Sequence, residues 1–190
     1  MTGSAPAYSP GYLTTADDGL HGVLSDTSEG FPRTVFGIAK KVHGVDSATI
    51  FGSMVSSGAG GGTQLVIGSQ ALGYNLRYNC AGASTMVLSG HNINENDWFP
   101  FILVEDVAER RVLVGAGTVV SQVGAGTPVT GGRKLGFGNC YNVSTTSDRG
   151  VPLSICGIIP GVALTETQML ALRIRLALQA RDAQNLSVVA

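Results

Sequence analysis

The chain has 190 residues, a formal net charge of -1, a hydrophobic share of 44% and a charged share of only 13%. This length fits one domain that can bury a substantial core without disulfides or metals. No run of basic residues is longer than a pair, which excludes the cationic surface that nucleic-acid binding needs to neutralise phosphates. The low charged share favours a surface that is partly covered by a partner, as in an oligomer.

The N-terminal residues lack the basic region and the apolar stretch of a signal peptide. No segment approaches the roughly 20 apolar residues of a membrane span, so we expect no membrane association. Three cysteines, Cys80, Cys140 and Cys156, form an odd number without a C-x-x-C pair. They are interpreted as three small buried residues of a chain made in a reducing cytoplasm, not as disulfides or zinc ligands.

Residues 1–30 are predicted to form a mostly irregular, extended N-terminal arm. The segment is rich in Ser, Thr, Gly and Asp, and Pro6 and Pro10 discourage regular structure. We expect this arm to be held either across its own domain or against a neighbouring molecule. Residues 31–190 then form the domain proper.

From residue 34 onward the pattern is that of short strands. Each run is rich in Val, Ile, Phe or Tyr and is bounded by Gly, Asn, Asp or Ser. The predicted strands are Thr34–Val42, Ala48–Met54, Gln64–Gly68, Leu72–Tyr78, Thr85–Leu88, Trp98–Val107 and Arg111–Val114. A spacing of about ten residues between such runs, with glycine-rich turns, predicts an all-β, two-sheet antiparallel sandwich.

One helix is predicted, at about residues 165–183. Thr165 and Gln168 form a capping box, in which each side chain satisfies a backbone donor of the other residue. Leu164 and Met169 stand at the positions of a hydrophobic staple, and Glu166 suits the positive end of the helix dipole.

The apolar residues of this helix spread over most of its circumference, more than one sheet face can cover. Two accounts fit this pattern. The helix is wedged between its own sheet and the arm, or it also contacts a second subunit. The residues predicted for such an interface are Met169, Leu170, Leu172, Ile174 and Leu178.

Several segments in this order resemble a known family. They are "SDTSEGFPRTVFGIAKK", the glycine-rich "GSMVSSGAGGGTQLVIG", "NENDWFPFILVED", "RRVLVGAG" and the exit "IIPGVALTETQMLALRIRLA". Over roughly residues 20–180 the chain resembles the concanavalin A-like, laminin-G-like jelly roll, in the variant found in bacteriophage and prophage virion proteins. The resemblance implies a jelly-roll sandwich that binds glycans or forms virion surfaces, commonly as a trimer.

Carboxylates were considered for glycoside hydrolysis. Glu105 and Glu109 would share one face of a continuous strand, with Val107 between them and Asp106 on the other face. Such a pair would be about 13 Å apart, whereas glycosidases need about 5–9.5 Å. The histidines His21, His43 and His91 accompany no G-x-S-x-G elbow. No catalytic residue is predicted, and we expect the protein not to be an enzyme.

Two candidate binding sites remain. Tyr74, Asn75, Arg77, Asn79 and Trp98 combine aromatic and planar polar groups, as a glycan site requires, although Trp98 opens an apolar run and also suits the core. Asn94, Asn96 and Asp97 offer the hard oxygen ligands that Ca²⁺ prefers. The alternative for these three is a polar turn whose side chains bond their own backbone. No other cofactor is predicted.

Two functions therefore compete. The first is a structural virion component, made in the cytoplasm of a bacterial host, which decorates a capsid or belongs to a tail. It would assemble as a trimer, and with other virion proteins, through its arm and helix. The second is a carbohydrate- or receptor-binding module of a tail fibre or tailspike. The small size of the chain and its lack of a fibrous shaft favour the first.

Overall fold

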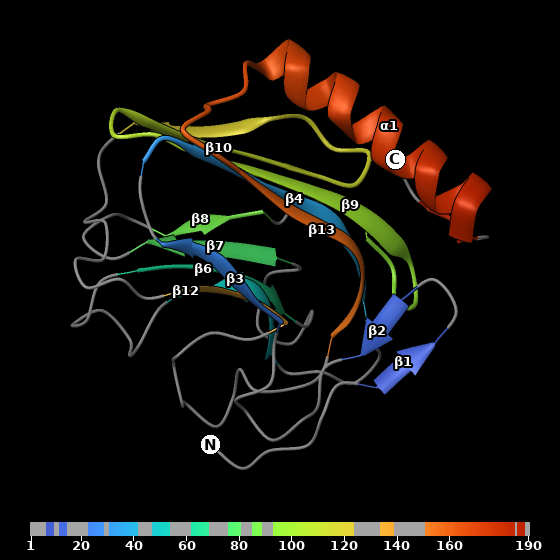
Figure 1. Cartoon of the computed structure of the whole chain (residues 1–190). Helices are drawn as coiled ribbons and strands as arrows, with labels where there is room; N and C mark the ends of the chain where they lie inside the picture. Colours follow the sequence, from blue (N-terminus) through green and yellow to red (C-terminus); the bar gives the residue numbers. More distant parts are fainter. Residues whose placement is uncertain are drawn as a thin grey trace.

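A computed structural model shows a β-sandwich with one helix (Figure 1). The structure describes residues 7–9, 12–14, 23–28, 31–41, 47–53, 62–68, 76–80, 85–88, 93–123, 134–138, 151–184 and 186–188. The strands are β1 (Ala7–Ser9), β2 (Tyr12–Thr14), β3 (Val23–Ser28), β4 (Arg33–Lys40), β5 (Ser47–Gly52), β6 (Thr63–Gly68), β7 (Leu76–Cys80), β8 (Met86–Val87), β9 (Trp98–Glu105), β10 (Glu109–Val114), β11 (Val120–Val123), β12 (Lys134–Phe137) and β13 (Pro152–Pro160). The helix, α1, spans Glu166–Gln184.

The strands form two antiparallel sheets. One has seven strands in the order β1-β2-β13-β4-β9-β10-β11, and the other has six in the order β3-β12-β5-β6-β7-β8. Consecutive strands repeatedly lie in different sheets, so the chain crosses between the layers as a jelly roll does. The predicted fold class, an antiparallel jelly-roll sandwich with one C-terminal helix, is confirmed.

Residues 1–30 contain more regular structure than the sequence predicted. β1 pairs with β2, and β2 pairs with β13 at the edge of the seven-stranded sheet. β3 pairs with β12 in the six-stranded sheet. The local composition of these segments predicted irregular structure. Pairing with distant strands gives their backbone N–H and C=O groups hydrogen-bond partners, so they form strands. The division of the chain into an arm and a domain at residue 30 stays a prediction.

The core has two layers. The first lies between the two sheets, where Phe99, Phe101 and Leu103 of β9 meet Leu65, Tyr78 and other residues of the six-stranded sheet. The second lies between the seven-stranded sheet and α1, which runs along the sheet's outer face (Figure 1). β9 is covered on both faces, so all eight of its residues are buried. This explains why its sequence is continuously apolar instead of alternating.

Two glycines serve packing inside strands and not turns. A Cβ atom at Gly37 would lie 2.7 Å from the ring of Phe101, and one at Gly157 would lie 2.4 Å from the ring of Phe36. Real Cβ atoms do not approach so closely, so each glycine makes room for a phenylalanine ring. The sequence pattern predicted glycine-rich turns but not this packing role inside strands.

The capping box of α1 is confirmed. The Thr165 backbone N–H donates to Gln168 Oε1 at 2.8 Å, and the Gln168 N–H donates to Thr165 Oγ1 at 3.3 Å. Leu164 packs against the layer that contains Met169, as the staple requires. Among the described helical residues, none forms a helix long and apolar enough to cross a membrane.

Candidate functional site

The outer surface at the β8 end of the six-stranded sheet gathers polar side chains. In β7, Leu76, Tyr78 and Cys80 point into the core, so Arg77 and Asn79 point outward. The Thr85 hydroxyl donates to Asn79 Oδ1 at 3.0 Å. Val87 of β8 pairs with Arg77 and is 52% exposed. We call Arg77, Asn79, Thr85 and Val87 the β7–β8 face.

The polar character of this surface continues inward along the sheet. Gln64 of β6 pairs with Asn79, and its amide nitrogen donates to the Thr49 hydroxyl at 2.8 Å. Both Gln64 and Thr49 are buried. The accessible part of the row is therefore its β7–β8 end, which presents a guanidinium, an amide and a hydroxyl beside one apolar side chain.

The structure brings together only two of the five predicted glycan residues. Arg77 and Asn79 share the β7–β8 face, while Tyr74 and Asn75 lie outside the described residues. Trp98 belongs to the other sheet, is 8% exposed and packs in the layer beneath α1. The ammonium of Lys40 lies 6.0 Å from the centre of its ring. Trp98 is thus a core residue, which was the alternative its apolar run suggested.

Thr85 and Val87 were missed as candidate site residues. The sequence had placed them in a strand, but strand alternation alone does not reveal which neighbour lies across from Arg77 and Asn79. The cross-strand register supplies that information.

The proposed calcium ligands form a closed turn. The Asn94 backbone N–H donates to Asp97 Oδ2 at 2.9 Å, and the Asp97 N–H donates to the Asn94 carbonyl at 3.2 Å. Asn96 has a φ of 69°, the left-handed conformation that Asn tolerates well. One oxygen of the Asp97 carboxylate thus bonds the local backbone, as in the polar-turn alternative.

A lysine supplies positive charge to this turn. Lys41 Nζ donates to the Ile93 carbonyl at 3.1 Å. Burial lowers the pKa of Lys41, and the negative charges of Glu95 and Asp97 act in the opposite direction. No group of three or more His, Cys, Asp or Glu in the described part of the chain is arranged to hold a metal ion. Calcium binding by the turn stays a prediction.

The carboxylates considered for hydrolysis lie on different strands. β9 ends at Glu105, and a turn closed by the bond from the Asp106 N–H to the Glu109 carbonyl, at 3.0 Å, leads into β10. The expectation of one continuous strand through Val107 was therefore wrong. Glu105 is fully buried and paired with Arg33, whereas Glu109 lies near the surface beside Arg111.

The predicted interface residues of α1 divide into two groups. Met169 is fully buried against the chain's own sheet, and Leu170 and Leu172 pack at the edge of the same layer. Ile174 and Leu178 are 55% and 43% exposed. Only these last two present a substantial apolar surface to a partner.

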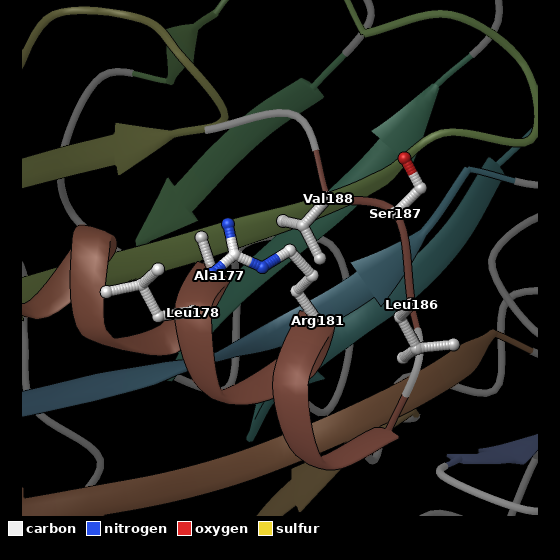
Figure 2. Close-up of a pocket in the computed structure, with 6 residues that line it drawn as sticks. All are labelled: Ala177, Leu178, Arg181, Leu186, Ser187 and Val188. Atoms are coloured by element: carbon white, nitrogen blue, oxygen red, sulfur yellow. The ribbon is translucent and has the colours of Figure 1, made fainter.

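A hollow of about 310 Å³ lies beside the C-terminal half of α1 (Figure 2). Its lining residues are Ala177, Leu178, Arg181, Leu186, Ser187 and Val188. The segment 186–188 returns along the helix, because the Leu186 N–H donates to the Ala180 carbonyl and Val188 forms a bridge with Trp98. Arg181 Nε donates to Asp182 Oδ1 at 2.7 Å, so the charged rim is internally paired.

The two described cysteines differ in environment, and both are free thiols. Cys80 is buried, as expected, and burial raises the pKa of its thiol. Cys156 is exposed, which corrects the interpretation of all three as buried. It adjoins the irregularity in β13 where the pairing with β4 shifts between Ser154 and Cys156. Cys140 lies outside the described residues.

Comparison with known proteins gives the fold but no family. No protein-family model matches the chain, and no curated protein matches it in sequence. The structure is similar to a heptameric pentraxin from Limulus polyphemus, with a TM-score of 0.61, 16% identity, and coverage of 96% of this chain and 89% of that one. It is also similar to domain 4 of an extracellular arabinanase from Geobacillus stearothermophilus, solved in complex with arabinotriose, with a TM-score of 0.62, 15% identity, and coverage of 90% and 82%.

A third likeness is to domains LG4-5 of the mouse laminin α1 chain, with a TM-score of 0.53 and 16% identity. The match covers 87% of this chain and 46% of the laminin structure. At these identities the comparisons establish architecture and not activity. The chain shares with these proteins the architecture of a jelly-roll sandwich.

Proposed function

We propose that the chain is a non-enzymatic binding module that holds an oligosaccharide on the β7–β8 face. The observation that carries this proposal is the outward alignment of Arg77 and Asn79 with the Thr85 hydroxyl. Sugar hydroxyls donate and accept hydrogen bonds, and these three side chains together offer both functions. Val87 adds an apolar patch against which a sugar ring can lie.

Two further points support a saccharide ligand. The planar guanidinium of Arg77 can donate two parallel hydrogen bonds, which suits neighbouring oxygens on one sugar. A domain of similar fold, from an arabinanase, was solved with arabinotriose bound. The sequence analysis had placed a structural role first, and the arrangement of the β7–β8 face now favours the binding role.

The test is a glycan array, followed by calorimetry with the best oligosaccharide. Arg77→Ala and Asn79→Ala should each weaken binding by about tenfold or more, since a hydrogen bond to a charged or well-aligned group contributes about 1–3 kcal/mol. Arg175→Ala is the matched control, because Arg175 is exposed on α1, on the opposite side of the molecule. Absence of wild-type binding, or binding unchanged in both face variants, would contradict the proposal.

The second candidate is the structural one: a bacteriophage virion component, made in the host cytoplasm, that assembles as a trimer with other virion proteins. Ile174 and Leu178 favour it, since they leave an apolar strip exposed on α1. Removing residues 1–30 would delete β1, β2 and β3 from the two sheets, so truncation cannot test it cleanly. The double variant Ile174→Ser, Leu178→Ser leaves the sheets intact.

Light scattering then distinguishes the outcomes. The structural candidate predicts a trimer for the wild-type chain and a monomer for the double variant. A monomer in both cases would contradict it. The helix and the β7–β8 face lie on opposite sides of the molecule. The glycan affinity of one chain should therefore be the same for the wild type and the double variant.

A further inference from the structure

A group of charged residues lies inside the sandwich, at the end of the inter-sheet core. Arg33 of β4 pairs with Glu105 of β9, and Glu105 pairs in turn with Arg110 of β10. The adjacent strands β4, β9 and β10 (Figure 1) thus place a carboxylate between two guanidinium groups. Arg110 alternates with Val112, which points between the sheets, so all three side chains face the six-stranded sheet. The exposed fraction is 2% for Arg33 and 0% for Glu105 and Arg110.

The carboxylate of Glu105 is satisfied by groups other than Arg110. Arg33 Nε donates to Glu105 Oε2, and the Tyr78 hydroxyl donates to Oε1 at 2.6 Å. Arg33 Nη2 also donates to the Thr63 hydroxyl at 3.1 Å. Each oxygen of Glu105 therefore accepts a hydrogen bond, Oε2 from Arg33 in the same sheet and Oε1 from Tyr78 in the opposite sheet.

Arg110 has no such partner. None of its Nε, Nη1 and Nη2 atoms is hydrogen-bonded to any other residue in the part of the chain that the structure describes. A guanidinium carries five N–H donors and does not lose its charge in proteins. Buried charges are normally paired, and buried donors are normally bonded. Arg110 meets neither condition within the described part of the chain.

The charge balance of the group points in the same direction. Among the residues that the structure describes, two guanidinium groups and one carboxylate give this buried group a net charge of about +1. Burial raises the pKa of both Tyr78 and Cys80, so both stay neutral near neutral pH. Neither supplies the missing negative charge.

We propose that Arg110 binds one small monovalent inorganic anion, of the size and charge of chloride, between the two sheets. One unit of negative charge neutralises the group, whereas a divalent anion would leave it negative. A halide accepts several N–H bonds at once, which suits a guanidinium with three unbonded nitrogens. The anion site would be part of the fold itself and independent of any ligand on the β7–β8 face.

The direct experiment is crystallography of the wild-type protein grown with sodium bromide. An anomalous bromine peak within about 3.5 Å of the Arg110 guanidinium nitrogens would support the proposal. Ordered water alone at these nitrogens, or bromide only at surface sites, would overturn it. This measurement needs no variant to fold.

Thermal unfolding gives a second, solution test. With gluconate held as the balancing anion at constant ionic strength, each tenfold rise in chloride above its Kd should raise the Tm by about 3–6 °C. Gluconate is much larger than chloride and serves as the reference anion that the proposed site would not admit. An equal Tm in chloride and in gluconate would overturn the proposal.

Arg110→Met removes the charge and keeps an elongated apolar side chain, so the chloride-specific rise in Tm should disappear. Arg111→Met is the matched control, because Arg111 lies on the same strand, on the opposite face and beside Glu109. The control should keep the full rise. A rise that persists in Arg110→Met would place the anion elsewhere and overturn the assignment.

Discussion

The seven-stranded sheet is covered on both faces, and the two layers use different chemistry. On its inner face, an apolar core ends in the charged group of Arg33, Glu105 and Arg110. On its outer face, the layer beneath α1 is apolar at its centre, and the helix leaves Ile174 and Leu178 in water. Both layers bury the central strand β9, but among the described residues the ion pair of Arg33 and Glu105 belongs to the inner layer.

This difference determines how each layer should respond to change. A charge inside a sandwich depends on every partner, because the removal of one leaves the others buried and unpaired. An apolar layer loses only the contacts and the volume of the group that is removed. The inner layer should therefore be the more sensitive to a single substitution.

The largest effect is expected for Glu105→Ala, which leaves the buried guanidinium of Arg33 without its carboxylate, beside the second buried guanidinium of Arg110. We expect a loss of about 3–5 kcal/mol in the free energy of unfolding, measured by urea denaturation. Glu109→Ala, near the surface beside Arg111, is the control and should change it by less than about 1 kcal/mol. Similar losses of unfolding free energy for Glu105→Ala and Glu109→Ala would contradict the expected difference between the buried charged group and the surface ion pair.

Leu176→Ala tests the outer layer, because Leu176 is buried between α1 and the sheet. The loss of contacts and the cavity should cost about 2–4 kcal/mol. Ile174→Ala, on the exposed side of the same helix, should cost less than about 1 kcal/mol in the isolated chain. If Ile174→Ala lowered the free energy of unfolding strongly, and did so only at high protein concentration, a second molecule would cover Ile174.

Tyr78→Phe removes one hydrogen bond to Glu105 and keeps the ring. Oε1 of the buried carboxylate then loses its hydroxyl donor, so we expect a loss of about 1–3 kcal/mol in the free energy of unfolding at neutral pH. Because burial raises the pKa of Tyr78 well above 10.0, its contribution is full below that pH and is lost as the pH rises toward the folded-state pKa. The difference in Tm between the two proteins should therefore be constant below about pH 10 and should shrink as the pH rises above it. A constant difference would contradict the raised pKa.

The smallest effect is expected at the start of α1. Thr165→Ala removes the cap oxygen that accepts from the Gln168 N–H and should cost about 1 kcal/mol. Thr167→Ala, two residues further along the helix and exposed, should be neutral or slightly stabilising, because Ala favours helix. Helix content by circular dichroism during thermal unfolding would separate the two.

Local patterns predicted the fold well because they act over a few residues. The capping box at Thr165 and Gln168 needs only four consecutive positions, and the strand at Gln64–Gly68 matches β6 to within one residue. The β7–β8 face was half predicted: Arg77 and Asn79 share it, but Trp98 does not. Strand alternation gives the face of each residue, but not which sheet the strand joins.

The apolar run at Trp98–Glu105 shows the limit most clearly. The sequence indicated a buried strand, and β9 is buried on both faces. It could not indicate that Glu105, at the end of that run, would be a core residue. Glutamate is rarely buried unless it is paired, and its partner Arg33 is 72 residues away in the sequence.

The sequence by itself determined the sandwich, the helix and its cap, because strand alternation, turn residues and capping are local physical preferences. Only the tertiary structure decided which leucines of α1 are buried, which residues flank Arg77, and that one carboxylate stands between two arginines. The last two of these outcomes depend on the register between strands that are distant in the chain. Register is set by the packing of the whole core, and a shift of one residue would send each of these side chains to the opposite face.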